Sequence, residues 1–304
     1  MVYKDEYDRW NYYKRMIKDN KKYLMFHSKK SFVKKIYHDN TNKDINIDQP
    51  QTFTEKLQYR KLTKNKLFEI CADKRKVRDY VKNKIGENYL IPEYFCKKKI
   101  MYKDLQDLPN EFIVKTSNGS GTNKLVLDKS KENLQELANL MNYYTTIKYG
   151  YIWGEFYYNR SNVSIVAEKL LKDENGQIPN DYKIHCFDDG KSKRKVIEVH
   201  YKVNGENKKN IYDENWKPIK DYIFGFSSDG RKIAKPKNIK ELLYVADKLS
   251  EDTNYVRVDL YNIKNKIYFG ELTFIPGAGY AHFEPETADL LWGKYMGKEK
   301  KWKN

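Results

Sequence analysis

The sequence is poor in the features that mark secreted, disulfide-rich or membrane-spanning proteins. Its three cysteines, Cys71, Cys96 and Cys186, are far apart and form no C-x-x-C pair, which argues against a disulfide framework or a zinc site. No segment approaches the roughly 18 consecutive apolar residues that span a bilayer. The opening residues include acids and have no apolar core, so they do not predict a secretory signal. We therefore expect a folded protein with free thiols in the reducing cytoplasm.

Signatures of several common functions are also missing. The chain contains neither the Walker A loop G-x-x-x-x-G-K-[ST] nor the dinucleotide fingerprint G-x-G-x-x-G. It shows no RRM, KH or helix-turn-helix pattern, and no Ser/His/Asp or Cys/His set of the kind used in nucleophilic catalysis. His185 and His200 fall in a predicted hairpin, where we expect them to be packed. Phosphate binding by another kind of loop stays open.

Positive charge is present in excess. Lys and Arg number 59 against 42 Asp and Glu, which gives a formal net charge of +17. Such a balance suits nucleic acid, an anionic membrane surface or anionic small molecules. The lysines are spread along the whole chain, and abundant Lys, Asn, Ile and Tyr are also expected of an AT-rich genome. Nucleic acid is therefore a disfavoured partner, and anionic small substrates explain the charge equally well.

Periodicity predicts an α+β chain with largely antiparallel sheets. Helices are expected over residues 52–67, 73–85, 130–141 and 238–249, and strands over 111–114, 163–171, 183–187, 195–201, 256–261 and 267–274. The first helix opens on the capping box Thr52-x-x-Glu55, Gly86 follows the second, and residues 210–226 are expected to be irregular. Residues 1–50 are basic and aromatic, which predicts a helical extension packed on the main body or, alternatively, a peripheral contact with an anionic membrane.

Two predicted strands late in the chain form a hairpin that carries paired acids. Arg257 and Asp259 share one face of the first strand with Tyr261, because side chains alternate along a strand. Glu271 lies in the second strand, so the hairpin brings it beside Asp259. Adjacent carboxylates repel unless a cation or proton lies between them, and oxygen ligands suit Mg²⁺. The alternative is a cross-strand arrangement of surface charges.

A lysine followed by a loop of small residues lies nearer the middle of the chain. Lys115 ends an apolar strand and leads into the loop TSNGSGTNK, residues 116–124, which contains Gly119 and Gly121. Small residues let backbone N–H groups approach a phosphate closely. An ordinary glycine-rich hairpin turn is the alternative interpretation.

Two further segments place charges within apolar strands. The strand IVAEKLL, residues 165–171, is interrupted by Glu168 and Lys169. It is either an edge strand with two solvated charges or a hinge whose backbone meets an adenine edge. Asp181 and Lys183 then share one face at the start of the next strand. Each signal is weak alone, and the order of the signals along the chain is what makes them informative.

This ordered set resembles the ATP-grasp superfamily, and VRVDLY…YFGELTFIPGAG is similar to the closing segment of D-alanine–D-alanine ligases. The fuller resemblance is to the TupA-like branch, found in teichuronopeptide, capsule and O-antigen gene sets. It rests on TFTEKLQY, ADKRKVRDYV, LPNEFIVKTSNGSG, IVAEKLL, DYKIHCFDDG and VRVDLY…GELTF, between residues 50 and 295. The implied fold is an ATP-grasp fold, in which two α+β subdomains with mainly antiparallel sheets clasp ATP. It would comprise a helical extension at 1–50, a further helical segment at 51–110 and the ATP-grasp domain at 111–304.

The resemblance implies roles for residues of the nucleotide site. Lys74 and Lys115 match two lysines that contact nucleotide phosphates, although Lys76 and Arg78 compete for the first role. Asp181 matches the carboxylate that binds the ribose. The implied mobile loop over the phosphates includes Ser117, Gly119, Ser120 and Gly121. The implied adenine hinge includes Glu168, Lys169 and Leu171.

The resemblance also implies the residues of the reacting end. Lys183 and Arg257 would face the γ-phosphate or an acyl-phosphate. Asp259 and Glu271 would hold Mg²⁺ against the phosphates. The superfamily usually has Asn two residues after the glutamate, where this chain has Thr273, so a weaker oxygen ligand takes that place.

The implied reaction is an ATP-dependent carboxylate–amine ligation. A carboxylate attacks the γ-phosphate of MgATP to give an acyl-phosphate and ADP, and an amine then displaces phosphate and leaves an amide. By the same resemblance, the acid is a sugar uronate or UDP-uronate and the amine an amino acid or amino alcohol, in capsule, O-antigen or teichuronopeptide synthesis. His282 is a candidate for lining the acceptor site. Two alternatives stay open: a basic non-catalytic module that binds anionic polymer or membrane, and a capsular glycosyltransferase, against which the missing D-x-D motif argues.

Overall fold

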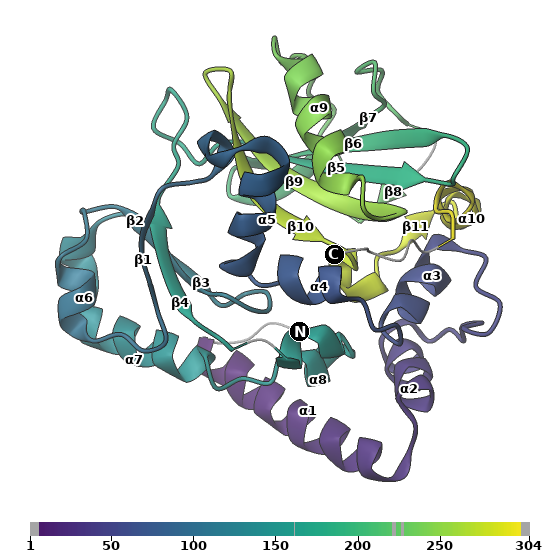
Figure 1. The fold of residues 1–304 in the computed structure, drawn as a ribbon, viewed down its shortest axis with the longest axis horizontal. Coiled ribbons are helices and arrows are strands. Elements are labelled where there is room, and N and C mark those ends of the chain that lie inside the picture. Colours follow the sequence, from purple (N-terminus) through teal and green to yellow (C-terminus); the bar gives the residue numbers. More distant parts are fainter. Residues whose placement is uncertain (1–5, 161, 221–222, 226–227, 299–304) are drawn as a thin grey trace.

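Two antiparallel sheets form the body of the protein, and helices cover their outer faces (Figure 1). The computed structural model describes residues 6–160, 162–220, 223–225 and 228–298. The α+β architecture, the antiparallel pairing and the helical N-terminal segment are as the sequence predicts. Within the described part of the chain, no helix combines the length and the apolar character needed to cross a membrane.

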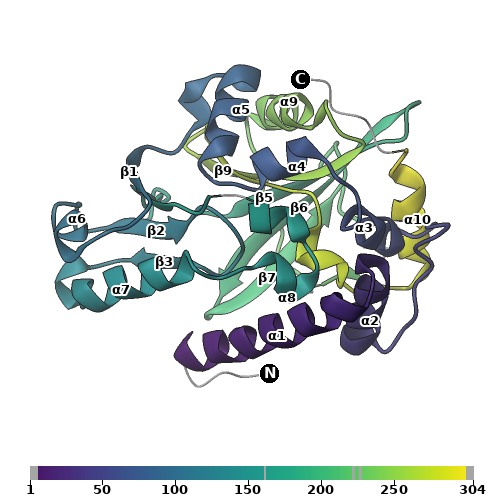
Figure 2. The same cartoon turned by 60° about the horizontal axis from the view of Figure 1, so that its bottom comes forward.

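The first sheet has the strand order β1-β4-β2-β3. Its strands are β1 (Glu93–Lys97), β2 (Phe112–Thr116), β3 (Asn123–Val126) and β4 (Ile165–Lys169). Phe112 and Val114 of β2 are buried in one apolar core together with residues of α6 (Tyr102–Gln106) and α7 (Leu134–Tyr144). These helices therefore cover one face of the sheet, and its other face is turned towards the second sheet (Figure 2).

The second sheet has the strand order β10-β9-β5-β6-β7. Its strands are β5 (Asp181–Asp188), β6 (Lys193–Val203), β7 (Glu206–Tyr212), β9 (Tyr255–Ile263) and β10 (Lys266–Thr273). Val258 and Leu260 of β9 are fully buried in the core that also contains the apolar face of α9 (Ile239–Ser250). Because side chains alternate, Arg257 and Asp259 lie on the opposite face. One face of this sheet is therefore apolar and the other is charged.

A β-bulge in β10 decides which face Glu271 occupies. The pairing register shifts between Phe269 and Glu271, so that Phe269 pairs with Leu260 and Glu271 pairs with Asp259. Gly270 is the additional residue, and a Cβ on it would lie 3.0 Å from the backbone oxygen of Asp259. A bulge inserts one residue and turns the following side chains to the other face. Without it, Glu271 would point with Phe269 into the apolar core.

The N-terminal extension is helical, as predicted, and packs on the main body. It consists of α1 (Glu6–Phe26) and α2 (Lys29–Thr41). Trp10 of α1 is 2% exposed and shares a core with sheet residues such as Phe112. Figures 1 and 2 show α1 running along one edge of the molecule from the α7 side to α2.

Further short elements connect these parts. They are α3 (Phe53–Arg60), α4 (Lys66–Cys71), α5 (Lys76–Ile85), η1 (Glu87–Tyr89), η2 (Lys129–Lys131), α8 (Gly150–Trp153), η3 (Phe156–Arg160), β8 (Ile223–Phe224), η4 (Pro276–Gly279), β11 (Phe283–Glu284) and α10 (Thr287–Tyr295). β8 and β11 pair with each other. The three cysteines are free thiols, as expected.

Local polar contacts explain several differences from the predicted boundaries. The helix expected over 52–67 keeps its capping box but is divided into α3 and α4, because Asn65 accepts a hydrogen bond from the Leu67 N–H and starts a new helix. The helix expected from 130 begins at Leu134, where Asn133 is the cap. The expectation of irregular structure from 210 is wrong for the end of β7, whereas residues 221–222 and 226 of that segment lie outside the described residues.

Arg60 of α3 joins the two ends of the β9–β10 hairpin. Its side chain is 1% exposed. Nη1 donates to the backbone oxygens of Tyr255 at 2.9 Å and Phe274 at 3.0 Å, and Nη2 donates to Asn254 Oδ1. These carbonyls lie at the start of β9 and just after β10, so one guanidinium fixes where the hairpin enters and leaves the sheet.

We expect Arg60→Met to lower the free energy of unfolding by about 3 kcal/mol, because the Tyr255 and Phe274 carbonyls would be left buried and unsatisfied. Urea denaturation followed by circular dichroism measures the change. Arg75→Met is the matched control, since the Arg75 side chain is 44% exposed and its loss should change stability by less than about 0.5 kcal/mol. Equal losses in both variants would contradict the assigned role of Arg60.

Candidate functional site

The charged face of the second sheet and the first sheet enclose a cavity of about 300 Å³. Most of the site residues expected from the sequence line it. They are Lys74, Lys115, Gly119, Ser120, Gly121, Glu168, Lys169, Leu171, Asp181, Lys183, Asp259 and Glu271. These residues span about 200 positions of the chain. The fold therefore brings together segments that the sequence analysis related only by their order along the chain.

One end of the cavity is apolar. Side chains suited to the faces of a flat ring line it, namely Ile91, Ile113, Leu125, Leu170, Leu171, Ile178 and Pro179. Ile91 precedes β1, and Ile113 and Leu125 lie on β2 and β3. The other four follow β4 in the segment that leads to β5. This end of the cavity can hold a purine-sized group out of water.

Glu168 lies next to this apolar end between two cations. Its Oε2 accepts from Lys115 Nζ at 2.5 Å, and its Oε1 accepts from Arg78 Nη1 at 3.3 Å. Glu168 is 4% exposed, so burial requires such partners. Because Arg78 also donates to the Ile91 backbone oxygen at 3.0 Å, it links Glu168 to the segment that leads into β1.

Lys74 enters the cavity beside the glycine loop. Its Nζ donates to the Gly119 backbone oxygen at 2.8 Å, and burial lowers its pKa to about 8 while Glu271 opposes this shift. Lys76, in contrast, is exposed and does not line the cavity. The geometry therefore favours Lys74 over its two rivals for a phosphate contact.

The glycine loop has a backbone that only glycine adopts readily. Gly119 and Gly121 have φ values of +69° and +72°, in the left-handed region. A Cβ on Gly119 would also lie 2.7 Å from the Tyr149 ring. Arg9 of α1 donates from Nη2 to the Gly121 backbone oxygen at 2.9 Å. The loop is thus held between the N-terminal helix and a buried tyrosine.

Ser117 does not line this cavity, unlike the other predicted loop residues. It is fully buried, its Oγ accepts from the Ser164 N–H at 3.1 Å, and its backbone oxygen accepts from the Lys74 N–H at 2.7 Å. Both of its polar groups therefore hold the base of the loop against neighbouring segments.

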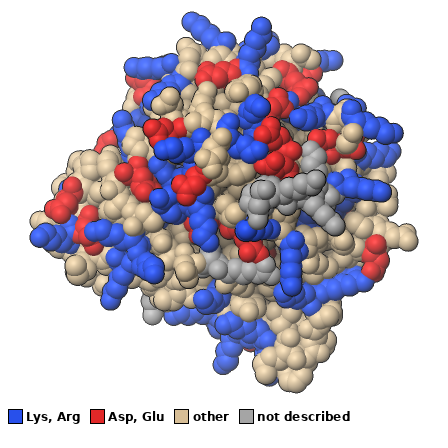
Figure 3. Space-filling model, viewed as in Figure 1, with Lys and Arg blue, Asp and Glu red and all other residues tan. Residues whose placement is uncertain are grey.

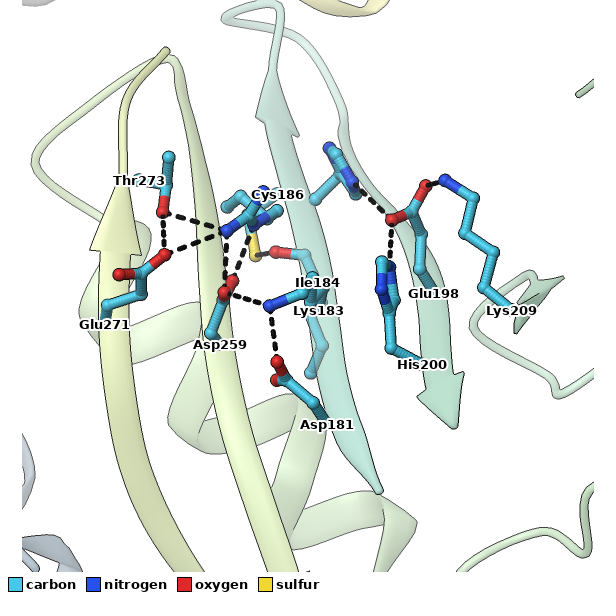
Figure 4. A network of polar contacts seen from close by, with 12 residues as sticks. Asp181, Lys183, Ile184, Cys186, Glu198, His200, Lys209, Asp259, Glu271 and Thr273 are labelled. Atoms are coloured by element: carbon cyan, nitrogen blue, oxygen red, sulfur yellow. Dashed lines mark hydrogen bonds and ion pairs between the residues drawn. The ribbon is translucent and has the colours of Figure 1, made fainter. Parts of the chain in front are cut away.

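Asp181, Lys183 and Asp259 form a polar network across β5 and β9 (Figure 4). Lys183 Nζ donates to Asp181 Oδ2 at 2.5 Å and to Asp259 Oδ2 at 2.6 Å. Burial raises the pKa of Asp181, which Lys183 opposes. The second oxygen, Oδ1, is buried without a hydrogen-bond partner among the described residues. It is an available acceptor for a ligand hydroxyl.

Arg257 clamps both carboxylates of the hairpin. Its Nε and Nη2 each donate to Asp259 at 2.7 Å, and Nη2 also lies 3.0 Å from Glu271 Oε1 and 3.1 Å from Thr273 Oγ1. Burial alone would raise the pKa of Asp259, but Arg257 and Lys183 lower it to about 2. Asp259 is therefore ionised at neutral pH.

The hairpin acids fit a hard divalent cation. Asp259 and Glu271 are direct cross-strand neighbours and offer only oxygen ligands, as Mg²⁺ prefers. Glu271 is 48% exposed in its side chain and faces the cavity. Thr273 Oγ1 donates to Glu271 Oε1 at 2.8 Å. The described residues contain no group of three or more His, Cys, Asp or Glu side chains placed to bind a metal.

A second cavity of about 580 Å³ continues beyond Lys74 and Glu271. No local signal in the sequence predicts this cavity, because its walls include residues of α1, of α8 and η3, and of η4, three segments far apart in the chain. Arg257 lines this cavity and not the first one. His282 lies elsewhere, in a third cavity of about 360 Å³ beside α2 and α10.

The histidines of the second sheet, His185 and His200, are packed, as expected. His185 is fully buried, and its Nδ1 is 2.9 Å from Tyr255 Oη. His200 Nε2 is 2.8 Å from Glu198 Oε2, and the other Glu198 oxygen accepts from Lys209 (Figure 4). Neither histidine lines the first or second cavity.

Comparison with solved structures gives distant similarities. An N5-carboxyaminoimidazole ribonucleotide synthetase in complex with ADP is 10% identical (TM-score 0.43; 68% of this chain and 45% of that chain covered). D-Alanine–D-alanine ligase from Helicobacter pylori is 17% identical (TM-score 0.43; 76% and 59% covered). Phosphoribosylamine–glycine ligase from Thermotoga maritima is 12% identical (TM-score 0.42; 78% and 57% covered). The chain thus spans about half the length of these structures, and no curated protein matches it.

A family model described as TupA-like ATPgrasp matches residues 55–297. This range contains every residue of the first cavity, from the Lys74 segment to the β9–β10 hairpin. It leaves α1 and α2 outside. Because the match extends over most of the 304 residues, the chain belongs to the TupA-like ATP-grasp family.

Proposed function

We propose that the protein is an ATP-dependent carboxylate–amine ligase. The observation that carries the proposal is the first cavity, which combines apolar side chains, a glycine loop with two lysines, and paired carboxylates, the groups that one ATP molecule requires. The finer proposal, supported by the family, is that the acid is a sugar uronate or UDP-uronate and the amine an amino acid or amino alcohol. The setting would be capsule, O-antigen or teichuronopeptide synthesis in the cytoplasm.

The chain's own residues would bind and orient ATP. The apolar side chains around Leu170 and Leu171 would pack against adenine at the hinge formed by residues 168–171. The free Oδ1 of Asp181 would accept from a ribose hydroxyl. Lys74, Lys115 and the backbone of the loop at Gly119 to Gly121 would bind the phosphates, because cations and converging N–H groups stabilise such charge.

Asp259 and Glu271 would hold Mg²⁺, which supplies charge neutralisation at the phosphates when bound. Lys183 and Arg257 contact the same carboxylates, so they lie where charge on a transferred phosphoryl group would gather. Fixed cations of this kind need no rearrangement when that charge develops. Thr273 lies within hydrogen-bond distance of Glu271 and Arg257 and would hold both in position.

The reaction would proceed in two transfers. A carboxylate oxygen attacks the γ-phosphorus, the bond to the β-phosphate oxygen breaks, and ADP leaves with an acyl-phosphate remaining. The amine nitrogen then attacks the acyl carbon, phosphate leaves, and the nitrogen loses a proton to give the amide. Holding the reactants in position accounts for much of the rate, since phosphoryl transfer needs little covalent help from protein.

The competing non-catalytic interpretation has less support. On the face in Figure 3, Lys and Arg are scattered among acidic residues and do not gather in one patch. Trp10 of α1 is turned into the core, so α1 does not present all its aromatic residues outward. Met25 and Phe26 at the end of α1 are exposed, and peripheral membrane contact would depend on them.

We expect MgATP to raise the melting temperature of the wild type, since a ligand at a hundred times its Kd stabilises a protein by about 2.7 kcal/mol. Glu271→Gln should remove the part of this rise that requires Mg²⁺, because one of two carboxylate ligands is lost. Glu206→Gln is the control, because the Glu206 side chain is 72% exposed on β7. Differential scanning fluorimetry with ATP, with and without Mg²⁺, measures all three proteins.

An unchanged Mg²⁺ effect in Glu271→Gln would refute the metal assignment. A wild type that MgATP does not stabilise would remove the basis of the ligase proposal.

A screen of uronates, UDP-uronates, amino acids and amino alcohols with MgATP should release ADP only with a matching acid and amine. The product should have the summed mass of acid and amine less one water, which mass spectrometry measures. Loss of UDP with formation of a glycosidic bond would instead favour the glycosyltransferase interpretation. Binding of MgATP without turnover of any pair would leave the nucleotide site intact and contradict the substrate proposal.

A further inference from the structure

The second cavity opens directly from the nucleotide cavity. Both are lined by the same residues at their junction, namely Lys74, Gly119, Ser120, Gly121, Gly270 and Glu271. These are the residues at the phosphate end of the first cavity. A molecule in the second cavity would therefore meet the terminal phosphate of a bound nucleotide.

The two ends of the second cavity differ in charge. Near the junction lie the cations Lys74 and Arg257, together with Arg9, which donates to the Gly121 backbone oxygen. The far end is aromatic, with Tyr13, Trp153, Tyr158 and Tyr280 in its walls, whereas Tyr149 lies against Gly119 at the junction and Trp10 lies against Arg9. Aromatic ring faces attract cations and repel anions. A substrate carboxylate would therefore be unfavourable at the far end and favourable beside the cations at the junction.

A single carboxylate, Glu155, lies among these rings. It is 5% exposed and lines the cavity. Its Oε1 accepts from Tyr157 Oη at 2.5 Å, and within the described part of the chain it has no ion-pair partner. Lys61 is the cation whose charge lowers the pKa of Glu155. Its Nζ donates to Tyr280 Oη at 3.2 Å and lies 4.3 Å from the centre of that ring.

A buried carboxylate with no cation within ion-pair distance is costly. Burial, with a smaller contribution from Glu271, raises the pKa of Glu155 to about 7 against the opposing effects of Tyr157 and Lys61. Removing a carboxylate from water without a cation beside it costs several kcal/mol. A cationic ligand in the cavity would offset this cost and would also contact the surrounding rings.

We propose that Glu155 and the aromatic rings around it form the subsite for the ammonium group of the amine substrate. This rests on the ligase function proposed above. The acid would then lie at the junction, between Arg257 and the phosphates, and the amine beyond it. The distance between the two ends of one cavity would select acids and amines that fit together. Because Trp10 and Tyr13 belong to α1, the N-terminal extension would help to select the amine.

The test uses n-butylammonium as the probe, because the natural amine is unidentified. Butan-1-ol and butyrate serve as its neutral and anionic counterparts of similar size. Isothermal titration calorimetry, with MgATP present and at about pH 8 so that Glu155 is ionised, should show binding of butylammonium in preference to both. Glu155→Gln should weaken butylammonium about tenfold or more, as loss of a buried charge-assisted contact predicts.

Three outcomes would overturn the proposal. They are equal affinity of butylammonium for wild type and Glu155→Gln, a wild-type preference for butanol or butyrate, and no butylammonium binding by the wild type. Glu206→Gln, on the opposite part of the second sheet, should bind like the wild type. If Glu155 only balances the charge of Lys61 within the fold, the affinity for butylammonium will not depend on it.

Folding and nucleotide binding are measured separately. Glu155→Gln should melt no lower than the wild type, since an amide of equal size replaces a costly buried carboxylate, and it should keep the rise in melting temperature with MgATP. Should that variant not fold, the wild-type preference for butylammonium over butanol still decides the question. A protein that does not bind MgATP fails as a ligase, whereas one that binds MgATP but ignores the charge of the probe refutes only the ammonium subsite.

Discussion

An ionised carboxylate held inside the protein is the constraint on which the site depends. Asp259 is 3% exposed, and it stays charged because Arg257 and Lys183 contact both of its oxygens. Such a group is stable only when its partners are fixed. The two strands that carry these three residues are fixed by an apolar core on their other face, with Val258 and Leu260 fully buried. Strand alternation thus gives the sheet one apolar face, which packs in the core, and one charged face, which lines the first cavity.

The bulge at Gly270 is the second condition for this division. It turns Glu271 away from the core that Phe269 enters and places it beside Asp259. The same shift brings Thr273 opposite Arg257. One inserted residue therefore builds the oxygen-rich end of the cavity without any change in the apolar face. Arg60 then holds both ends of this hairpin from α3.

The parts of the site that follow from local rules could be predicted from the sequence. Alternation in VRVDLY placed Arg257 and Asp259 on one face, and two glycines indicated the loop after Lys115. Gly270 inside a strand was a signal for a bulge that the prediction did not use. The second cavity had no local signal, because Trp10 and Glu155 meet only through packing of helices far apart in the chain. Ser117 likewise differs from its neighbours only in where its hydrogen bonds lead.

The position of α1 ties the N-terminal segment to both cavities. The family model begins at residue 55, yet Arg9 holds the Gly121 carbonyl, and Trp10 forms a wall of the second cavity. A segment outside the range that the family model matches thus forms part of the wall of the second cavity. Replacement of this leading segment would alter both the wall of the second cavity and the support of the loop at Gly121, so neither cavity is structurally independent of α1.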